Sequence, residues 1–454
     1  MRKGLVLLSF IVASIVANAQ TEDSLFIRRI ANEILTNSTA YQNLNVLTKQ
    51  VGGRLAGSPQ MVKAEAWGLQ TLKAANADTA WLQACLVPHW VRGGKDEATA
   101  KYAHGKLKKL EVLALGNSVG SMKPLTAPVI EVDSFADLEA KKNEVKGKIV
   151  FYNYKFKPTF VQTFQSYGDA VPYRSDGPSR AAKYGAVAVV VRSMSHSTDN
   201  NPHTGATRYA DSLPKIPALA VGLQDADWLS NAVAQGAVTI TLKTAGRFLP
   251  DTTGHNVIGE LKGTQFPDQY ITIGGHLDSW DPAEGAHDDG TGCVQTIEIL
   301  RTLQVLGYKP KHTLRFVLFA NEENGLRGGT KYAEEAQRNG EKHLFALESD
   351  AGGFTPRGFS IGGTDAVLKK FQAWIPLLAP YGATEIAAGG GGADVSPLSQ
   401  TQATPVAELR PDSQRYFDVH HARSDVFEAV NKRELELGAV TMAALIYLVD
   451  KYGL

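Results

Sequence analysis

The stretch YITIGGHLDSWD (Tyr270–Asp281) decides the fold, because an apolar β-type run leads directly into a glycine-flanked turn with polar side chains. Tyr270–Ile273 has the composition of a buried strand. Gly292–Leu306 has the apolar spacing of a helix, and Thr313–Ala320 and Leu344–Leu347 are two further strand-like runs. Strands that alternate with helices predict an α/β fold, a mostly parallel sheet with helices on both faces.

Polar turns lie at or shortly after the ends of these strands. They are GGHLDSWD (Gly274–Asp281), GAHDDGTG (Gly285–Gly292), ANEENGLRGG (Ala320–Gly329) and LESDAGG (Leu347–Gly353), and HHARSD (His420–Asp425) adds histidine near the C-terminus. Each one alone is more often a solvated turn or a helix cap than a ligand. Together they gather at the carboxyl ends of parallel strands, where such sheets bind ligands. One His, several Asp and Glu and another His are the ligand set of a co-catalytic metal pair.

A stretch from about Thr126 to Lys243 differs from its flanks because it contains β-rich apolar runs such as KGKIVFYNY (Lys146–Tyr154). We expect residues 126–243 to form an inserted β-rich domain, with residues 20–125 and 244–454 forming the catalytic domain. The alternative is a continuation of the same α/β sheet. No catalytic constellation appears in the insert. Tyr167–Ser175 and His196–His203 are expected to be surface loops that overhang the active site or contact a second subunit of a homodimer.

The N-terminus has the features of an export signal. Arg2 and Lys3 precede an apolar run, Leu5–Val16, and a small-residue site ends at Ala19, which predicts a Sec signal peptide over residues 1–19 and a secreted or periplasmic protein. No later segment approaches the roughly 20 apolar residues of a membrane span. Removing residues 1–19 moves the formal net charge from +1 to −1, which gives no electrostatic reason to expect a nucleic-acid partner.

At the polar turns the chain resembles the M28 family of zinc exopeptidases. The resemblance extends to GGRLAGSP (Gly52–Pro59), VPHWVRGG (Val87–Gly94) and YFDVHHARSD (Tyr416–Asp425), and it spans nearly the whole chain after residue 19. It implies a zinc aminopeptidase-like catalytic domain and identifies the insert with a protease-associated (PA) domain. It also implies two zinc ions (Zn²⁺) per chain and a small peptide as substrate. Cobalt (Co²⁺) or manganese (Mn²⁺) can share such ligands.

The resemblance also assigns roles to single residues. One zinc would be held by His276 and Asp350, the second by Glu323 and His421, with Asp288 as the bridge. Glu322 would be the general base, which takes a proton from the attacking water and delivers it to the leaving amine. Asp278 would accept the ring N–H of His276 and fix its tautomer. A cis peptide is expected between Asp288 and Asp289.

Three further residues are assigned to substrate binding. His420 and His421 are adjacent, and in a strand their side chains would point to opposite sides. The spacing to Asp425 favours His421 as the ligand and leaves His420 for substrate. Tyr416 is expected to donate to the oxyanion. Asp394 in GGGGADVSPL matches a loop beside the substrate pocket, and it either binds a substrate terminus or belongs to a flexible turn.

We therefore expect a dinuclear zinc exopeptidase that hydrolyses dipeptides or short unblocked peptides. For a dipeptide, aminopeptidase and carboxypeptidase describe the same cut. Two alternatives share the fold: a glutaminyl cyclase-type transferase with one zinc, and a non-catalytic receptor-like ectodomain. The complete set of five ligands argues against the first. The presence of those ligands together with Glu322 argues against the second.

Overall fold

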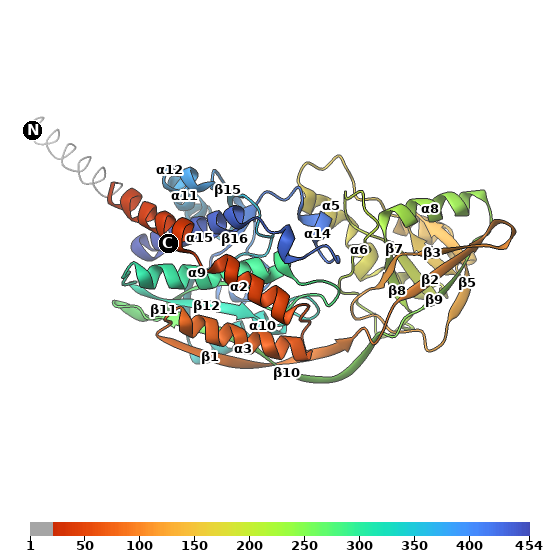
Figure 1. The fold of residues 1–454 in the computed structure, drawn as a ribbon, viewed down its shortest axis with the longest axis horizontal. Coiled ribbons are helices and arrows are strands. Elements are labelled where there is room, and N and C mark those ends of the chain that lie inside the picture. Colours follow the sequence, from red (N-terminus) through yellow and green to blue (C-terminus); the bar gives the residue numbers. More distant parts are fainter. Residues whose placement is uncertain (1–20) are drawn as a thin grey trace, which may run out of the picture.

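The computed structural model describes residues 21–454, so the expected signal peptide lies outside the described residues. The chain forms two eight-stranded sheets, each in its own lobe (Figure 1). None of the helices within residues 21–454 combines the length and apolar character that crossing a membrane requires.

The larger sheet has the strand order β1-β10-β12-β11-β13-β16-β14-β15. Its strands are β1 (Thr79–Val91), β10 (Arg247–Leu261), β11 (Phe266–His276), β12 (His312–Phe319), β13 (Lys342–Glu348), β14 (Pro356–Gly362), β15 (Glu385–Ala388) and β16 (Val406–Pro411). The central strands β12, β11, β13 and β16 run parallel, as predicted. Towards the edges, β10 is antiparallel to β12 and to β1, and β14 is antiparallel to β16.

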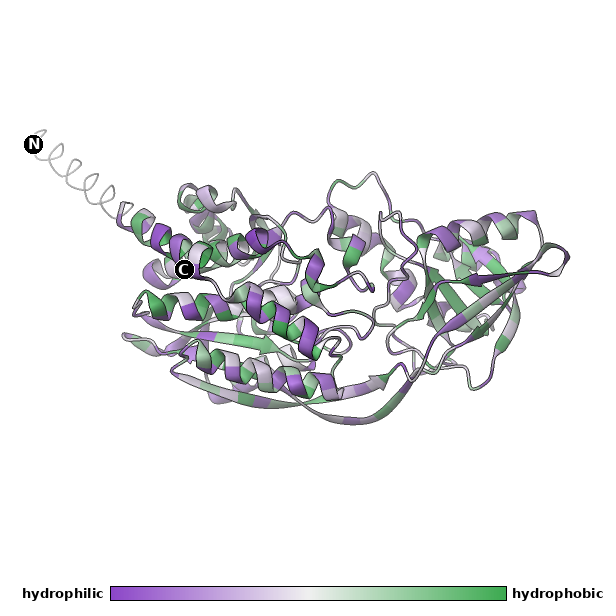
Figure 2. Ribbon diagram, viewed as in Figure 1, coloured by the Kyte–Doolittle hydropathy of each residue, from purple (hydrophilic) through white to green (hydrophobic). Residues whose placement is uncertain are grey.

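Helices cover both faces of this sheet. On one face lie the helical residues 21–37, α2 (Ala40–Val46), α3 (Pro59–Ala74), α9 (Thr291–Val305), α11 (Asp365–Ala373), α12 (Ile375–Leu378) and α15 (Lys432–Tyr452), and on the other α10 (Arg327–Asn339) and α13 (Ser396–Gln402). Ile273 of β11, Leu300 of α9 and Leu445 of α15 are fully buried in one core. Burying such a side chain stabilises the fold by roughly 1.5–3 kcal/mol. The helices alternate polar and apolar stretches in Figure 2, as helices with one buried face do.

The smaller sheet has the order β3-β2-β9-β5-β6-β7-β8-β4 and is separate from the first. Its strands are β2 (Glu97–Tyr102), β3 (Lys106–Leu110), β4 (Val112–Ala114), β5 (Leu125–Val132), β6 (Ile149–Tyr152), β7 (Ala188–Arg192), β8 (Ala218–Val221) and β9 (Thr239–Lys243). The helices of this lobe are α4 (Phe135–Ala140), α5 (Thr163–Ala170), α6 (Pro172–Ser175), α7 (Gly177–Ala182) and α8 (Leu223–Gln235). The insert is therefore not a continuation of the larger sheet.

The smaller sheet begins at Glu97, upstream of the boundary expected at Thr126. Its strand β2 pairs with both β3 and β9, so β9 has a partner that the expected boundary leaves outside the insert. Strand β3 (KLKKL) forms one edge of the sheet and is rich in lysine, and β2 (EATAKY) beside it consists mostly of small and polar residues. Edge strands of this kind lack the continuous apolar run by which the other strands were found.

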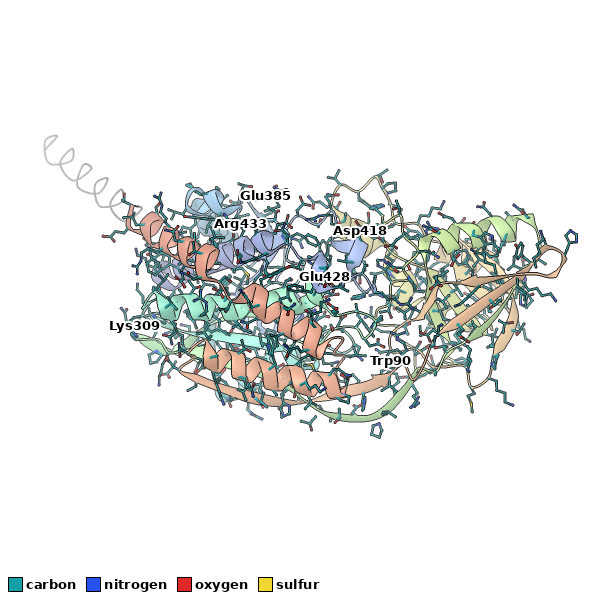
Figure 3. All side chains as sticks on the ribbon, viewed as in Figure 1. Trp90, Lys309, Glu385, Asp418, Glu428 and Arg433 are labelled. Carbon is teal, nitrogen blue, oxygen red and sulfur yellow. The ribbon has the colours of Figure 1, made fainter. Side chains whose placement is uncertain are left out.

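The junction between the lobes is held by aromatic residues. Strands β1 and β10 form a long ribbon that runs from the larger sheet towards the smaller one (Figure 1). Trp90 lies at this junction (Figure 3), where its indole N–H donates to the carbonyl of Ser118 at 2.9 Å. Its ring meets Trp280 edge-on at 6.3 Å. A Cβ on Gly116 would lie 1.7 Å from the Trp280 ring, so only glycine lets the smaller lobe approach this closely.

Of the two segments expected as surface loops, Tyr167–Ser175 is helical and mostly buried or half-buried, whereas His196–His203 is irregular and exposes His196 and Thr198. Tyr167–Ser175 contains the end of α5 and all of α6, and Arg174 is 9% exposed. His203 is 5% exposed. The expectation was wrong for Tyr167–Ser175, because this side of the insert packs on the other lobe, where the Tyr167 ring stacks on Phe417 with centroids 4.8 Å apart. His196–His203 is a loop, and within it only Pro202 and His203 are buried.

Candidate metal centre

The predicted ligands meet at the carboxyl ends of the central strands. His276 is the last residue of β11, Glu323 follows β12, and Asp350 follows β13. Asp288 lies in the turn between β11 and α9. His421 reaches the same place from the segment after α14 (Tyr416–Val419). Neighbouring parallel strands thus bring together residues that are far apart in the sequence.

His276 faces two carboxylates. Its Nε2 atom lies 3.2 Å from Oδ1 of Asp288 and 3.3 Å from Oδ1 of Asp350. Its Nδ1 atom is 2.9 Å from the backbone carbonyl oxygen of Asp278. A proton on Nδ1 would be donated to that carbonyl, which leaves the Nε2 lone pair directed at the carboxylates.

His421 has a matching arrangement. Its Nε2 atom lies 3.1 Å from Oε2 of Glu323 and 3.3 Å from Oδ2 of Asp288. Its Nδ1 atom is 3.2 Å from the backbone carbonyl oxygen of Thr204, a residue of the smaller lobe. Asp288 therefore points one carboxylate oxygen at each histidine, which is the placement a bridging ligand needs.

The donor set fits a pair of divalent cations. Oδ2 of Asp288 and Oδ1 of Asp350 are buried and accept no hydrogen bond from any residue within 21–454. Buried oxygens without a partner are costly unless something else satisfies them. Imidazole nitrogen and carboxylate oxygen are ligands that zinc accepts. The nearby Cys293 donates its thiol to the backbone carbonyl of His276, and burial raises the pKa of that thiol. Two geometric groups of potential ligands, Asp288 with His420 and His421, and His276 with Asp289 and Asp350, lie side by side.

The charges of the site also favour the binding of cations. Burial alone would lower the pKa of His276, but Asp350 and Asp288 outweigh it and raise that pKa well above its ordinary value. Burial would likewise lower the pKa of His421, and Glu323 and Asp288 raise it instead. The carboxylates thus draw positive charge into the site. Metal cations would neutralise the same carboxylates.

Asp278 orients the site by different atoms from those expected. Its carboxylate Oδ1 is 3.7 Å from Nδ1 of His276, whereas its backbone carbonyl oxygen is 2.9 Å away, so the carbonyl is the nearer acceptor of the ring N–H. The carboxylate accepts the backbone N–H groups of Glu322 at 3.0 Å and Glu323 at 3.3 Å. These amides lie nearer to it because the turn after β12 folds over Asp278.

His420 and His421 point to the same side, contrary to the expectation for a strand. Their rings stack with centroids 3.6 Å apart and planes inclined by 19°. The segment is not a strand: it leaves the short helix α14, and His421 adopts a positive φ of 60°. Nε2 of His420 is 3.7 Å from Oδ2 of Asp288, farther than Nε2 of His421. The geometry therefore favours His421 as the ligand.

Glu322 differs from its neighbour Glu323 in having no close imidazole partner. Burial and the carboxylates of Asp350 and Glu323 outweigh His276 and raise the pKa of Glu322 well above its ordinary value. A carboxyl group whose pKa is raised towards the working pH suits proton transfer. The peptide bond between Asp288 and Asp289 is cis, as the resemblance implied.

Asp289 and Asp425 secure the turn that carries Asp288. The carboxylate of Asp289 accepts the backbone N–H groups of His276 at 3.0 Å and Gly292 at 2.9 Å, so both of its oxygens are engaged. Asp425 accepts the backbone N–H of Asp288 at 3.1 Å. These contacts favour Asp288 over Asp289 as the bridging residue.

Arg54, in the segment GGRLAGSP, has a supporting role that the sequence did not reveal. Its side chain is fully buried and donates to the backbone carbonyls of Leu277 at 2.5 Å, Glu284 at 2.8 Å and Gly285 at 3.0 Å. It thereby ties the turn after His276 to the turn before Asp288. Only the burial of an arginine between two glycine-rich turns could have signalled this role.

The remaining predicted residues lie around the centre rather than in it. Tyr416 is 2% exposed and its ring lies 5.0 Å from that of His420. Asp394 is fully buried, and within residues 21–454 neither of its carboxylate oxygens has a hydrogen-bond partner. Its backbone N–H donates to Glu348 at 3.3 Å. Burial and Glu348 raise the pKa of Asp394 well above its ordinary value.

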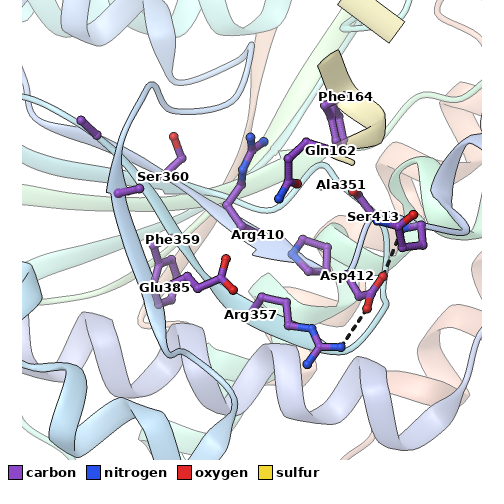
Figure 4. A pocket seen from close by; sticks show the side chains of 14 residues that line it. Gln162, Phe164, Ala351, Arg357, Phe359, Ser360, Glu385, Arg410, Asp412 and Ser413 are labelled. Atoms are coloured by element: carbon purple, nitrogen blue, oxygen red, sulfur yellow. Dashed lines mark hydrogen bonds and ion pairs between the residues drawn. The ribbon is translucent and has the colours of Figure 1, made fainter. Parts of the chain in front are cut away.

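A cavity of about 330 Å³ near Asp350 lies between the two lobes (Figure 4), and none of the five proposed metal ligands lines it. Ala351, the neighbour of Asp350, forms part of its wall, and Gln162 and Phe164 line it from the smaller lobe. Arg410 of β16 also lines it and is paired with Glu408 at 3.0 Å. Sequence reasoning missed this pocket because its walls come from separate strands and from the insert.

Three comparisons with known proteins agree with this geometry. Residues 256–446 match the sequence model of Peptidase family M28, and this range includes all five proposed ligands. Carboxypeptidase Q from Mus musculus is 34% identical over 412 residues, which is 90% of this chain and 85% of that protein, and carboxypeptidase Q from Homo sapiens is 34% identical over the same shares. The resemblance of the segments around Gly52, Val87 and Tyr416 was to this branch of the family.

Solved structures give the same answer for the fold. The crystal structure of a peptidase M28 precursor from Shewanella amazonensis has a TM-score of 0.90 and 32% identity, and the match covers 96% of this chain and 98% of that one. A zinc aminopeptidase from Bacillus subtilis has a TM-score of 0.63 at 19% identity and covers 90% of this chain and 93% of its own, which shows a shared fold. This chain therefore belongs to peptidase family M28 and is a metallo-exopeptidase, as its sequence predicted.

Proposed function

We propose that this chain is a dinuclear zinc exopeptidase that hydrolyses dipeptides or short unblocked peptides. The observation that carries the proposal is the placement of Asp288, with one carboxylate oxygen towards His276 and the other towards His421. In this arrangement His276 and Asp350 would hold the first ion, and Glu323 and His421 would hold the second. Three protein ligands per ion leave room for water and substrate.

The catalytic step relies on Glu322. When bound, two zinc ions would polarise the scissile carbonyl and lower the pKa of the attacking water. Glu322 accepts the proton of that water and delivers it to the leaving amine. Asp278 fixes the backbone of Glu322 through its amide, so the base keeps its position relative to His276. We assign Tyr416 and His420 to substrate binding, with Tyr416 as the donor to the carbonyl oxygen.

The substrate would lie between the two lobes. We assign the cavity near Asp350 to one substrate side chain, because its wall includes Ala351, the residue that follows the proposed ligand Asp350. Asp394 offers two unpartnered carboxyl oxygens to the substrate ammonium group. We assign the smaller lobe to the PA type, since it is a β-rich insert with a sheet of its own and the sequence resembles that of a family in which such inserts occur.

We further propose that the protein is exported and that its chains pair as homodimers. The support for export is the basic and then apolar N-terminal sequence that ends at Ala19. The mass of the purified protein, measured by light scattering, tests the pairing, and its N-terminal residue tests cleavage after Ala19.

The test of the activity combines metal analysis with a panel of substrates. We expect a ratio of two zinc ions per chain, and cleavage of free dipeptides but not of dipeptides blocked at either end. A ratio of one, with cyclisation of N-terminal glutamine, would instead support the glutaminyl cyclase alternative. Two bound ions without hydrolysis of any peptide would contradict the catalytic proposal.

A further inference from the structure

A small cavity lies on the insert side of the stacked rings of His420 and His421. Its volume is about 10 Å³, the room that one water molecule or one ion of similar size occupies. Its walls include Tyr167, Arg174, Ser193, His203 and His420, and no carboxylate lines it. The metal centre described above lies on the other side of the histidine stack.

Arg174 brings a positive charge to this cavity and forms no ion pair with any of the described residues. It is 9% exposed, and its donors reach the hydroxyl of Tyr167 at 2.8 Å and the carbonyl of Thr204 at 3.4 Å. Its Nε atom has no hydrogen-bond partner, and Arg174 makes no ion pair within residues 21–454. A buried charge without an opposite charge is strongly unfavourable, so a compensating group is to be expected.

His203 adds a second unsatisfied donor. It is 5% exposed, and both of its ring nitrogens are buried without a hydrogen-bond partner among residues 21–454. An imidazole carries at least one N–H in either tautomer. A second guanidinium, that of Arg192, also lines the cavity and is already paired with Asp227 at 2.7 Å. The unpaired donors of Arg174 and His203 therefore require a hydrogen-bond acceptor that carries negative charge.

We propose that this cavity binds a monatomic anion of the size of chloride, held by Arg174 and His203. A metal cation is excluded by the guanidinium groups and by the lack of any carboxylate in the wall. Carboxylates and phosphates are too large for the space. A water molecule fits and would satisfy the hydrogen bonds, but it would leave the charge of Arg174 uncompensated.

The anion would steady the surroundings of the second metal ligand. Nη1 of Arg174 lies 3.3 Å from Nδ1 of His421, and a Cβ on Gly205 would lie 2.4 Å from the guanidinium carbon. Gly205 thus lets the arginine and the histidine pack against the same backbone. Fixing Arg174 with an anion fixes the face on which the histidine stack rests.

The test measures thermal unfolding of the metal-free full chain. We expect the melting temperature to rise saturably with sodium chloride or sodium bromide, compared with sodium gluconate at equal ionic strength, because only an anion that fits the cavity binds the folded state. Arg174→Met should abolish this difference. Arg208→Met, which removes an exposed arginine from the same lobe, should keep it. Equal melting temperatures in the three salts, or an unchanged difference in Arg174→Met, would overturn the proposal.

A second measurement covers the case in which Arg174→Met does not fold. Crystals of the unaltered protein grown in sodium bromide should show an anomalous bromide peak within hydrogen-bond distance of Nε of Arg174. An ordered water without anomalous signal at that position would refute the anion. Neither experiment depends on zinc or on peptide hydrolysis, so its failure is distinguishable from failure of the proposed function.

Discussion

At the scale of single residues, the metal centre depends on which atom of each side chain is free. Asp288 and Asp289 are neighbours of identical chemistry, yet Asp289 accepts two backbone N–H groups while Oδ2 of Asp288 accepts none. The sequence could name the pair and, through the family resemblance, the order of roles. The sequence could not show that the backbone carbonyl of Asp278 is the nearest acceptor for the His276 ring, because the position of that carbonyl depends on the backbone path of the turn.

The first prediction concerns the base. Glu322→Gln should retain both metal ions, because Glu322 is not a ligand, and should lose turnover by about 10²–10⁴-fold, the usual contribution of general-base catalysis. The measurement is kcat on a free dipeptide together with bound zinc. If turnover stays near that of the unaltered protein, the proton acceptor is another group.

The second prediction concerns the bridge. Asp288→Asn should lose at least one zinc ion and the activity, because a neutral amide leaves two cations close together with less negative charge between them. Asp289→Asn is the matched control, and it should keep more zinc because its remaining oxygen still accepts a backbone N–H. Zinc content after dialysis decides the matter. Two tightly held ions in Asp288→Asn would place the bridge elsewhere.

At the scale of elements, apolar runs identified the central strands because a parallel strand buried on both faces is apolar along its length. Thr313–Ala320 and Leu344–Leu347 were found in this way, as β12 and β13. The histidine pair was misplaced because a short helix and a residue of positive φ leave no periodic signal. The strands β2 and β3 upstream of Thr126 gave no signal for a similar reason, since β2 is mostly small and polar and β3 is rich in lysine.

The third prediction concerns the charge of Glu341, the residue that precedes β13. Burial opposes ionisation of Glu341, but hydrogen bonds from His343 and Arg315 outweigh it and lower the pKa of Glu341 to about 2, from a model-compound value of 4.5. The stabilisation is therefore complete above pH 4.5 and is lost as the pH falls towards 2. Glu341→Gln should cost roughly 1–3 kcal/mol of unfolding free energy at neutral pH, discounted for partial exposure.

Urea unfolding of the two proteins at a series of pH values measures this effect. The difference between them should shrink as the pH falls below 4.5. Glu428→Gln, at an exposed carboxylate paired with Lys49, is the control and should change stability little at any pH. A Glu341→Gln difference that does not vary with pH would show that the carboxylate stabilises by packing rather than by charge.

At the scale of the whole molecule, the two lobes contribute different parts of the proposed site. All five proposed metal ligands come from the larger lobe, whereas the smaller lobe contributes the carbonyl of Thr204 behind His421 and two side chains of the cavity beside Asp350. The sequence indicated that no ligand comes from the insert. It could not indicate how closely the insert packs on the site, because contacts between lobes leave no periodic pattern in either segment.

The last prediction tests this division with Phe164 of α5, which stacks on Tyr416 at 5.5 Å and lies under the guanidinium of Arg410. Phe164→Ala should raise KM for dipeptides, because it removes one wall of the cavity, and should leave bound zinc unchanged. His421→Ala should lose zinc. Phe248→Ala, at an exposed phenylalanine of β10, is the control and should change neither. If Phe164→Ala released zinc while His421→Ala retained it, the smaller lobe would belong to the metal centre, and the assignment of ligands to the larger lobe would have to be abandoned.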